Sequence, residues 1–173
     1  MKKQLKHFWV LILLCMASHT ALAQNPIDPW VGEWSGPLEI YNAKGLSQTV
    51  TMGLNVAQLS DSSWTWQIVY GEGEGRQERN YELLKTEGIG NFVVDEKNSI
   101  VLDLNLIKNG LFSFFQVGKS KQLISYELVD ESIHFRTHSV NTDTETKTGG
   151  EENVPLVLSW KTGVYQTAVL KKK

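Results

Sequence analysis

The sequence predicts an all-β fold, a single up-and-down antiparallel β-barrel of about ten strands over residues 24–173. Short stretches rich in Val, Ile, Trp, Tyr and Phe recur along the chain, and turn-forming residues separate most of them. When consecutive strands are paired as hairpins, their apolar residues fall on a common face. A sheet of this many strands usually curls or closes, because closure removes its exposed edges.

The turn signals divide the chain into its expected strands. Turns are expected at residues 43–45, 60–62, 71–75, 87–88, 95–98, 109–110, 118–120, 130–131, 141–153 and 162–163. The segment 77–85 also contains helix-forming residues. The pattern does not fix the register of the strands at 76–86 and 89–95.

The first hairpin has one apolar face if its loop contains three residues with Gly45 in the left-handed conformation. Trp34 then lies opposite Leu54, and Leu38 lies opposite Val50. A three-residue loop at 60–62 continues this face through Trp66, Ile68 and Tyr70.

Asn109-Gly110 is a strong signal for a two-residue type I′ turn, which would pair Lys108 with Leu111. One side of that hairpin would then carry Leu102, Leu104, Leu106, Ser113, Phe115 and Val117. The next two-residue turn would pair Tyr126 with Phe135. The last turn, at 162–163, would pair Trp160 with Tyr165.

The first residues have the features of a secretory signal peptide. Residues 1–6 contain three lysines, residues 8–16 are apolar, and Ala21-Leu22-Ala23 has the small-x-small pattern of a cleavage site. The apolar run is shorter than the roughly 20 residues of a membrane-spanning helix. We therefore expect export after removal of residues 1–23, to the periplasm or the medium of a bacterium, with no membrane span in the remaining chain.

Removing that segment changes the composition. The whole chain has 17 basic and 19 acidic residues and one cysteine, Cys15. Without the three lysines of the segment, 14 basic residues remain and the formal net charge falls from −2 to −5. The remaining chain has no cysteine for disulfide or thiol chemistry and no basic excess for nucleic acid. The sequence does not predict an oligomeric state.

A barrel of about ten strands encloses more room than its own side chains easily fill. Its inner face is expected to be aromatic, and the expected ligand-binding residues are Trp64, Trp66, Tyr70, Phe115, Tyr126, Phe135 and Tyr165. Such a lumen suits an apolar or flat small molecule in a pocket of several hundred cubic ångströms. The alternative is that these rings pack a closed core.

Gly32-Glu33-Trp34, on the first expected strand, resembles the G-x-W motif of lipocalins and other calycins. The resemblance implies a calycin-like barrel in which Trp34 packs across the closed end as a structural plug. The wider pattern, which includes Gly36, resembles the start of nitrobindin-type haem-binding barrels.

The last strand of those haem-binding barrels has the form H-x-x-A-x-L-x-[KR], and its histidine binds the haem iron. The corresponding residues here are Tyr165, Ala168, Leu170 and Lys172. This resemblance implies haem as a possible cofactor with Tyr165 at the ligand position, since tyrosinate can bind ferric haem.

Recognisable catalytic and metal motifs are missing from the sequence after residue 23. His134 and His138 would stand roughly 13 Å apart on one strand, too far to share a zinc ion. Residues 71–75 are glycine-rich but lack the lysine of a phosphate-binding loop, and we expect them at the barrel rim. Asn141 begins a run with EF-hand ligand offsets, but Thr146 stands where that loop needs glycine. We expect no metal site and no enzymatic activity.

Three functions agree with these observations. The first is a secreted or periplasmic carrier or binder of a small hydrophobic ligand in the barrel lumen. The second is a barrel that binds haem or another tetrapyrrole. The third is an interaction module with a closed barrel, in which the loops at 71–75 and 141–153 form a joint surface.

Overall fold

The computed structural model describes residues 25–173, and the expected signal peptide, residues 1–23, lies outside this range. The described chain forms thirteen strands and three short 3₁₀ helices. The strands are β1 (Gly32–Asn42), β2 (Gly45–Val56), β3 (Gln58–Ser60), β4 (Ser63–Tyr70), β5 (Gln77–Lys85), β6 (Asn91–Asp95), β7 (Val101–Ile107), β8 (Gly110–Val117), β9 (Ser120–Val129), β10 (Ser132–Asn141), β11 (Thr146–Thr148), β12 (Val157–Ser159) and β13 (Thr162–Lys172). The 3₁₀ helices are η1 (Asp28–Trp30), η2 (Gly73–Gly75) and η3 (Thr142–Thr144).

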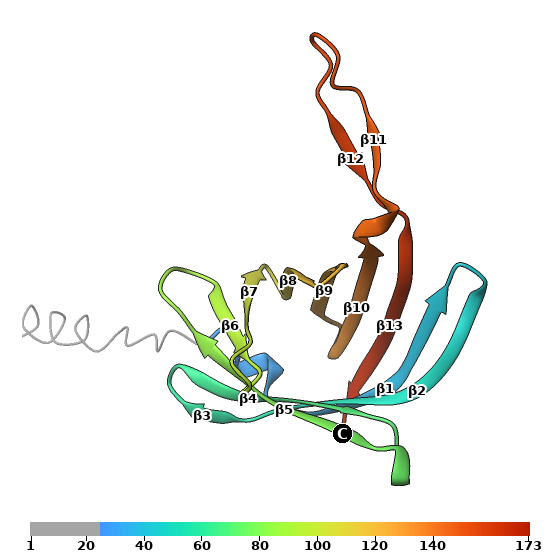
Figure 1. Ribbon diagram of the computed structural model, residues 1–173. Coiled ribbons are helices and arrows are strands. Elements are labelled where there is room, and N and C mark those ends of the chain that lie inside the picture. The colour runs from blue at the N-terminus through green and yellow to red at the C-terminus, as the bar shows by residue number, and fades with distance from the viewer. Residues whose placement is uncertain (1–24) are drawn as a thin grey trace, which may run out of the picture.

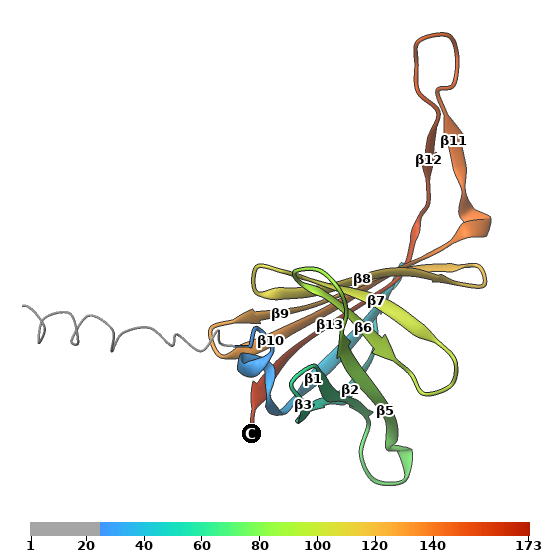
Figure 2. The ribbon, with the colours of Figure 1, turned by 90° about the vertical axis from the view of Figure 1, so that its left-hand side faces the viewer.

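Ten of these strands form a closed antiparallel barrel, which confirms the predicted fold class. The strand order is β2-β1-β13-β10-β9-β8-β7-β6-β5-β4-β3, and an additional pairing of β2 with β4 closes the sheet. β3 is a short extension beyond that closure. Figures 1 and 2 show the strands curving into a barrel, with β13 between β1 and β10.

Two hairpin registers agree with their prediction. Trp34 pairs with Leu54 and Leu38 with Val50, and Gly45 has a positive φ of 111°. Tyr126 pairs with Phe135 across β9 and β10. In the β9–β10 turn both Asp130 and Glu131 have positive φ, 46° and 59°, as a type I′ turn requires.

The register of the β7–β8 hairpin differs from the prediction by two residues. Leu106, and not Lys108, pairs with Leu111, so the turn is formed by Lys108 and Asn109. Gly110 already belongs to β8, where a Cβ atom would lie 2.6 Å from the ring of Phe112. The glycine therefore serves close packing and not the turn itself. A shift of two residues preserves the inner and outer faces.

The predicted turn at 162–163 is wrong, because Thr162 and Gly163 begin β13. Trp160 consequently does not pair with Tyr165. Instead β11 and β12 form a separate two-stranded hairpin that projects from the barrel between β10 and β13 (Figure 1). The segment 77–85, which contains helix-forming residues, is strand β5 and pairs with β4 from Gln77 to Leu84.

One end of the barrel is closed by the segment around η1. Ile27 and Trp30 are buried there together with Trp34. The indole Nε1 of Trp34 donates a hydrogen bond of 2.8 Å to the backbone oxygen of Trp30. Trp34 thus lies where the calycin resemblance implies, and Trp30 is a second tryptophan that fills the same end.

Steric contact explains why a glycine stands at position 36, the second glycine of the G-x-W-x-G pattern. A Cβ atom on Gly36 would lie 2.2 Å from the backbone oxygen of Val169 on β13. A backbone oxygen cannot move out of the way as the end of a flexible side chain can. Gly36 therefore permits the close approach of β1 and β13, next to the closed end.

We expect Gly36→Ala to lower the free energy of unfolding by about 1–3 kcal/mol, because the added methyl group would force β1 and β13 apart. The measurement is urea denaturation followed by tryptophan fluorescence. Gly75→Ala is the matched control, since a Cβ atom at Gly75 meets nothing within 4 Å, and it should change stability by less than about 0.5 kcal/mol. Equal stability of the two variants would contradict the steric explanation.

Candidate functional site

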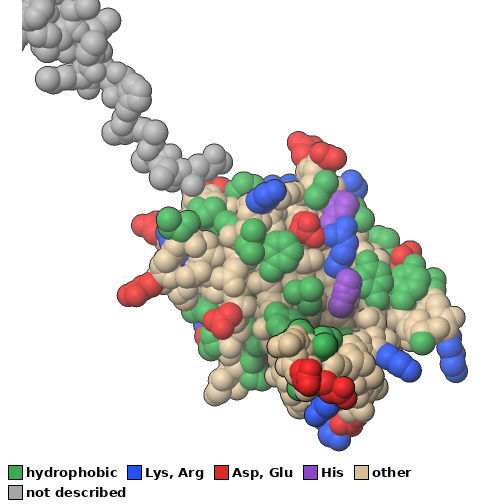
Figure 3. All heavy atoms as spheres, turned by 90° about the horizontal axis from the view of Figure 1, so that it is seen from above, with side chains coloured by type: hydrophobic (Ala, Val, Ile, Leu, Met, Phe, Trp, Pro, Cys, Tyr) green, Lys and Arg blue, Asp and Glu red, His purple; other side chains and the backbone are tan. Residues whose placement is uncertain are grey.

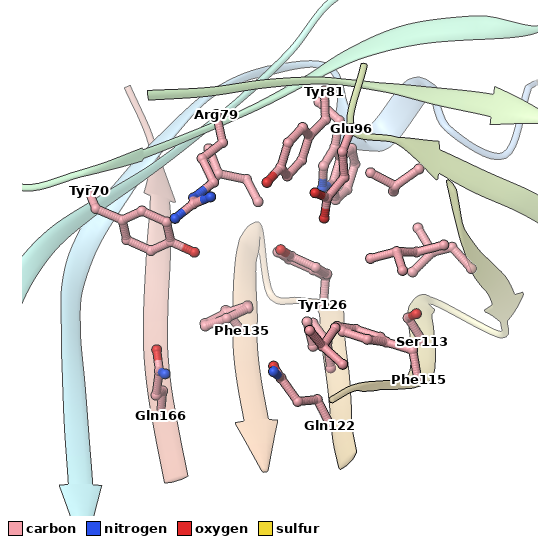
Figure 4. Close-up of a pocket in the computed structure, with 17 residues that line it drawn as sticks. Tyr70, Arg79, Tyr81, Glu96, Ser113, Phe115, Gln122, Tyr126, Phe135 and Gln166 are labelled. Carbon is pink, nitrogen blue, oxygen red and sulfur yellow. The ribbon is translucent and has the colours of Figure 1, made fainter. Parts of the chain in front are cut away.

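A cavity of about 420 Å³ lies inside the barrel, beyond the closed end. Inward-facing side chains of β4 to β10 and β13 line it (Figure 4). Five of the seven predicted ligand-binding residues are among them: Trp66, Tyr70, Phe115, Tyr126 and Phe135. The prediction of a pocket of several hundred cubic ångströms is confirmed, and ligand binding by these residues stays a prediction.

Aromatic rings form the inner part of the cavity wall. The rings of Trp66 and Tyr126 meet edge to face at 5.2 Å, and those of Tyr126 and Phe135 are 5.0 Å apart. Trp30 from the closed end contacts Trp66 at 6.3 Å. Edge-to-face and tilted pairs are the favourable arrangements for such rings. The chain of rings therefore connects the plug to the cavity and fixes the shape of its apolar wall.

Trp64 does not line the cavity. It is fully buried near the closed end, and its ring meets Phe92 edge to face at 6.2 Å. Trp64 and Trp66 both point inward because they are two residues apart on β4. Trp64 is the nearer of the two to the start of that strand, so it belongs to the packed core.

Tyr165 does not line the cavity either, because it lies on the outer face of β13. Its neighbour Gln166 faces the lumen, and side chains alternate along a strand. The ring of Tyr165 stacks on that of His138 at 4.7 Å and lies 6.1 Å from that of Tyr41. Figure 3 shows both histidines of the described chain on this outer face, on either side of a basic side chain. The expectation that Tyr165 presents a haem ligand to the lumen is therefore wrong.

Polar side chains gather on one side of the cavity (Figure 4). Tyr70 comes from β4, Arg79 and Tyr81 come from β5, and Glu96 directly follows β6. Gln122 and Gln166 lie on other walls. Sequence reasoning missed all of these except Tyr70. The pairing of Ile68 with Arg79 places the arginine on the inner face, and the sequence pattern leaves the register of β5 open.

The electrostatic state of these groups follows from their surroundings. A side-chain hydrogen bond to Tyr81 raises the pKa of the Arg79 guanidinium. Burial raises the pKa of Tyr70, although the charge of Arg79 opposes that rise. Burial also raises the pKa of Tyr126 far above its ordinary value. At neutral pH Arg79 is therefore a cation, and Tyr70 and Tyr126 are neutral hydroxyl groups.

Ser113 is an unusual member of the cavity wall. Its side chain is only 6% exposed, and its hydroxyl oxygen has no hydrogen-bond partner among the described residues. Buried hydroxyl groups without a partner cost free energy, and most folded proteins avoid them.

Within residues 25–173, no group of three or more His, Cys, Asp or Glu side chains is placed to hold a metal ion. The residues with EF-hand spacing that begin at Asn141 make contacts with protein groups. The Asn141 side chain accepts a hydrogen bond from the backbone nitrogen of Asp143, and Lys119 forms an ion pair with the Asp143 carboxylate at 2.8 Å. No helix in this part of the chain is long and apolar enough to cross a membrane.

The two loops of the interaction-module hypothesis do not form one surface. The β4–β5 loop, which contains η2, and the β11–β12 hairpin lie far apart in both views of the ribbon (Figures 1 and 2). The barrel is also hollow, whereas that hypothesis requires a closed core.

No family model matches the sequence, and no curated protein is significantly similar to it. Among solved structures, the S-type phycobiliprotein lyase CPES from Guillardia theta matches with a TM-score of 0.59 at 7% identity, over 85% of this chain and 90% of that one. A protein of unknown function from the DUF3598 family of Nostoc punctiforme matches with a TM-score of 0.58 at 12% identity. That match covers 85% of this chain and 49% of the other, so this chain spans about half of its length.

These likenesses show the fold. They agree with the calycin-like barrel that the G-x-W motif implies. A variant of the fluorescent protein UnaG superposes less well, with a TM-score of 0.46 at 12% identity over 85% of this chain.

We expect Ser113→Ala to raise the free energy of unfolding of the ligand-free protein by about 1 kcal/mol, because it removes a buried hydroxyl group without a partner. Chemical denaturation measures the change. Ser132→Ala is the matched comparison, since the buried Ser132 hydroxyl accepts a hydrogen bond of 2.6 Å from Lys171 Nζ. That variant should lose about 1–2 kcal/mol. A loss of stability in both variants would show that Ser113 has a partner in solution.

Proposed function

We propose that the protein is an exported, non-enzymatic binder or carrier of a small hydrophobic ligand held in the barrel lumen. The observation that carries the proposal is the cavity of about 420 Å³ with an aromatic wall. This volume lies within the range of about 300–1,000 Å³ that is typical of small-molecule sites. Transfer of apolar surface from water to this wall would drive binding.

The groups that line the cavity support binding without chemistry. Its tyrosines Tyr70 and Tyr126 hold their protons, because burial raises their pKa values. Among residues 25–173 the Ser113 hydroxyl group has no hydrogen-bond partner that could activate it as a nucleophile. One structural neighbour is named a lyase, but a likeness in fold does not transfer an activity.

Export is the second part of the proposal, and it rests on residues 1–23 of the sequence. A carrier outside the cytoplasm can serve without thiol chemistry, and the chain after residue 23 has no cysteine. Its net negative charge also fits a small apolar partner better than nucleic acid.

Ligand binding can be tested with N-phenyl-1-naphthylamine, a neutral dye whose fluorescence rises in apolar surroundings. We expect the native protein to bind it, and Ile124→Trp to weaken binding by more than about ten-fold, because Ile124 lines the cavity and the larger ring would fill it. Leu123→Trp is the matched control, since Leu123 is 44% exposed and lies on the outer face of the same strand. If the native protein binds neither this neutral dye nor an anionic dye with the same aromatic body, the proposed function is wrong.

A linear tetrapyrrole is a second candidate ligand. It is favoured by the fold shared with a protein named a phycobiliprotein lyase, and by the combination of a flat aromatic wall with polar groups. Haem is less well supported, since Tyr165 lies outside the lumen.

Biliverdin, an accessible linear tetrapyrrole, tests the second candidate. We expect a red shift of its visible absorption on mixing with the native protein, because a bound chromophore is desolvated and held in one conformation. Ile124→Trp should abolish the shift and Leu123→Trp should preserve it. An unchanged spectrum with the native protein would remove tetrapyrroles from consideration and leave the dye result standing.

A further inference from the structure

Arg79 differs from the arginines and lysines that form ion pairs in the described chain. Arg76, Lys97 and Arg136 form ion pairs with Glu78, Glu82 and Glu127 on the outside of the barrel or in its loops. Within residues 25–173, no carboxylate lies within 4.0 Å of the Arg79 guanidinium. Arg79 is instead an inward-facing residue of β5 and lines the cavity.

The groups beside Arg79 are the hydroxyl groups of two tyrosines. Figure 4 shows its side chain extending into the cavity toward Tyr70. The neighbouring Tyr81 raises the pKa of this guanidinium group. A guanidinium group has five N–H donors, and one phenol leaves most of them unused. Arg79 is exposed, so a ligand that enters the cavity can reach those donors.

Glu96 is the other charged residue on the cavity wall. Figure 4 shows it beside Tyr81, with its carboxylate directed into the cavity. It repels negative charge, and the two side chains together create a field across the polar side of the cavity. An anionic group would be attracted toward Arg79 and kept away from Glu96.

We propose that the ligand of this cavity is an apolar organic anion, a carboxylate or sulfonate whose negative group binds Arg79 while its body packs against the Trp66–Tyr126–Phe135 wall. This inference rests on the proposed function and adds the chemical class of the ligand. The hydroxyl groups of Tyr70 and Tyr81 lie on the same side and can donate to the same anion. The arrangement favours an anion over a neutral molecule of the same shape, because only the anion can accept charge-assisted hydrogen bonds from the guanidinium group.

Two dyes with nearly the same aromatic body test the proposal. 8-Anilinonaphthalene-1-sulfonate has a negative group, and N-phenyl-1-naphthylamine lacks it. We expect Arg79→Gln to weaken binding of the sulfonate dye about ten-fold and to leave the affinity for the neutral dye unchanged. Glu96→Gln should strengthen binding of the sulfonate dye several-fold, again without effect on the neutral dye.

Two controls separate the cavity from the rest of the surface. Arg76→Gln removes a cation from the adjacent loop that is already paired with Glu78, and it should alter neither affinity. Ile124→Trp should weaken binding of both dyes by more than about ten-fold, which would show that the sulfonate dye occupies the cavity and not an exposed apolar patch.

The outcomes distinguish the class of ligand from the function itself. If the native protein binds neither dye, the proposed function fails and this inference fails with it. If both dyes bind and Arg79→Gln weakens both equally or neither, the cavity is a binding site but its ligand is not selected by negative charge. Only a loss confined to the sulfonate dye supports the proposal.

Discussion

The pairing of β2 with β4 is the contact on which the rest of the structure depends. It joins the two ends of the ten-strand sheet and skips the short β3, so the sheet closes on itself. Closure fixes which face of every strand is the inside, because side chains alternate along each strand. It also fixes the diameter: ten strands leave more space than the inner side chains fill, and the remaining space is the cavity of about 420 Å³.

The closed and hollow parts of the lumen differ in their side chains. Near the start of β1 and β4, the large rings of Trp30, Trp34 and Trp64 are buried in the core. Toward the other end the inner side chains are smaller or polar, such as Ser113 and Gln166. One strand architecture therefore supplies both a packed core for stability and a site for a ligand. Gly36 contributes to the packed core, because it permits the close approach of β1 and β13.

Much of the barrel follows from local patterns in the sequence. The β9–β10 turn and the β1–β2 hairpin are predicted in their actual registers, because each has a single pairing that sorts apolar from polar residues. Asn109-Gly110 is misleading because the glycine is needed for contact with Phe112. On β13 both faces carry apolar and polar residues, so alternation alone does not show that Tyr165 is outside and Gln166 inside. Arg79 and Glu96 are missed for a related reason, because inward charges contradict the rule that defines an inner face. The pairing of β5 with β4 places Arg79 in the cavity wall, and Glu96 lines the cavity directly after β6.

The projecting β11–β12 hairpin leaves the barrel after β10 and returns at the start of β13, while those two strands stay paired with each other. Its length is thus uncoupled from the diameter of the barrel and from the shape of the lumen. Residues can be added to or removed from the hairpin without moving any side chain that lines the cavity. In evolution and in engineering alike, this is the place where the protein can acquire a new segment, such as a tether or a fused domain, and keep its interior unchanged.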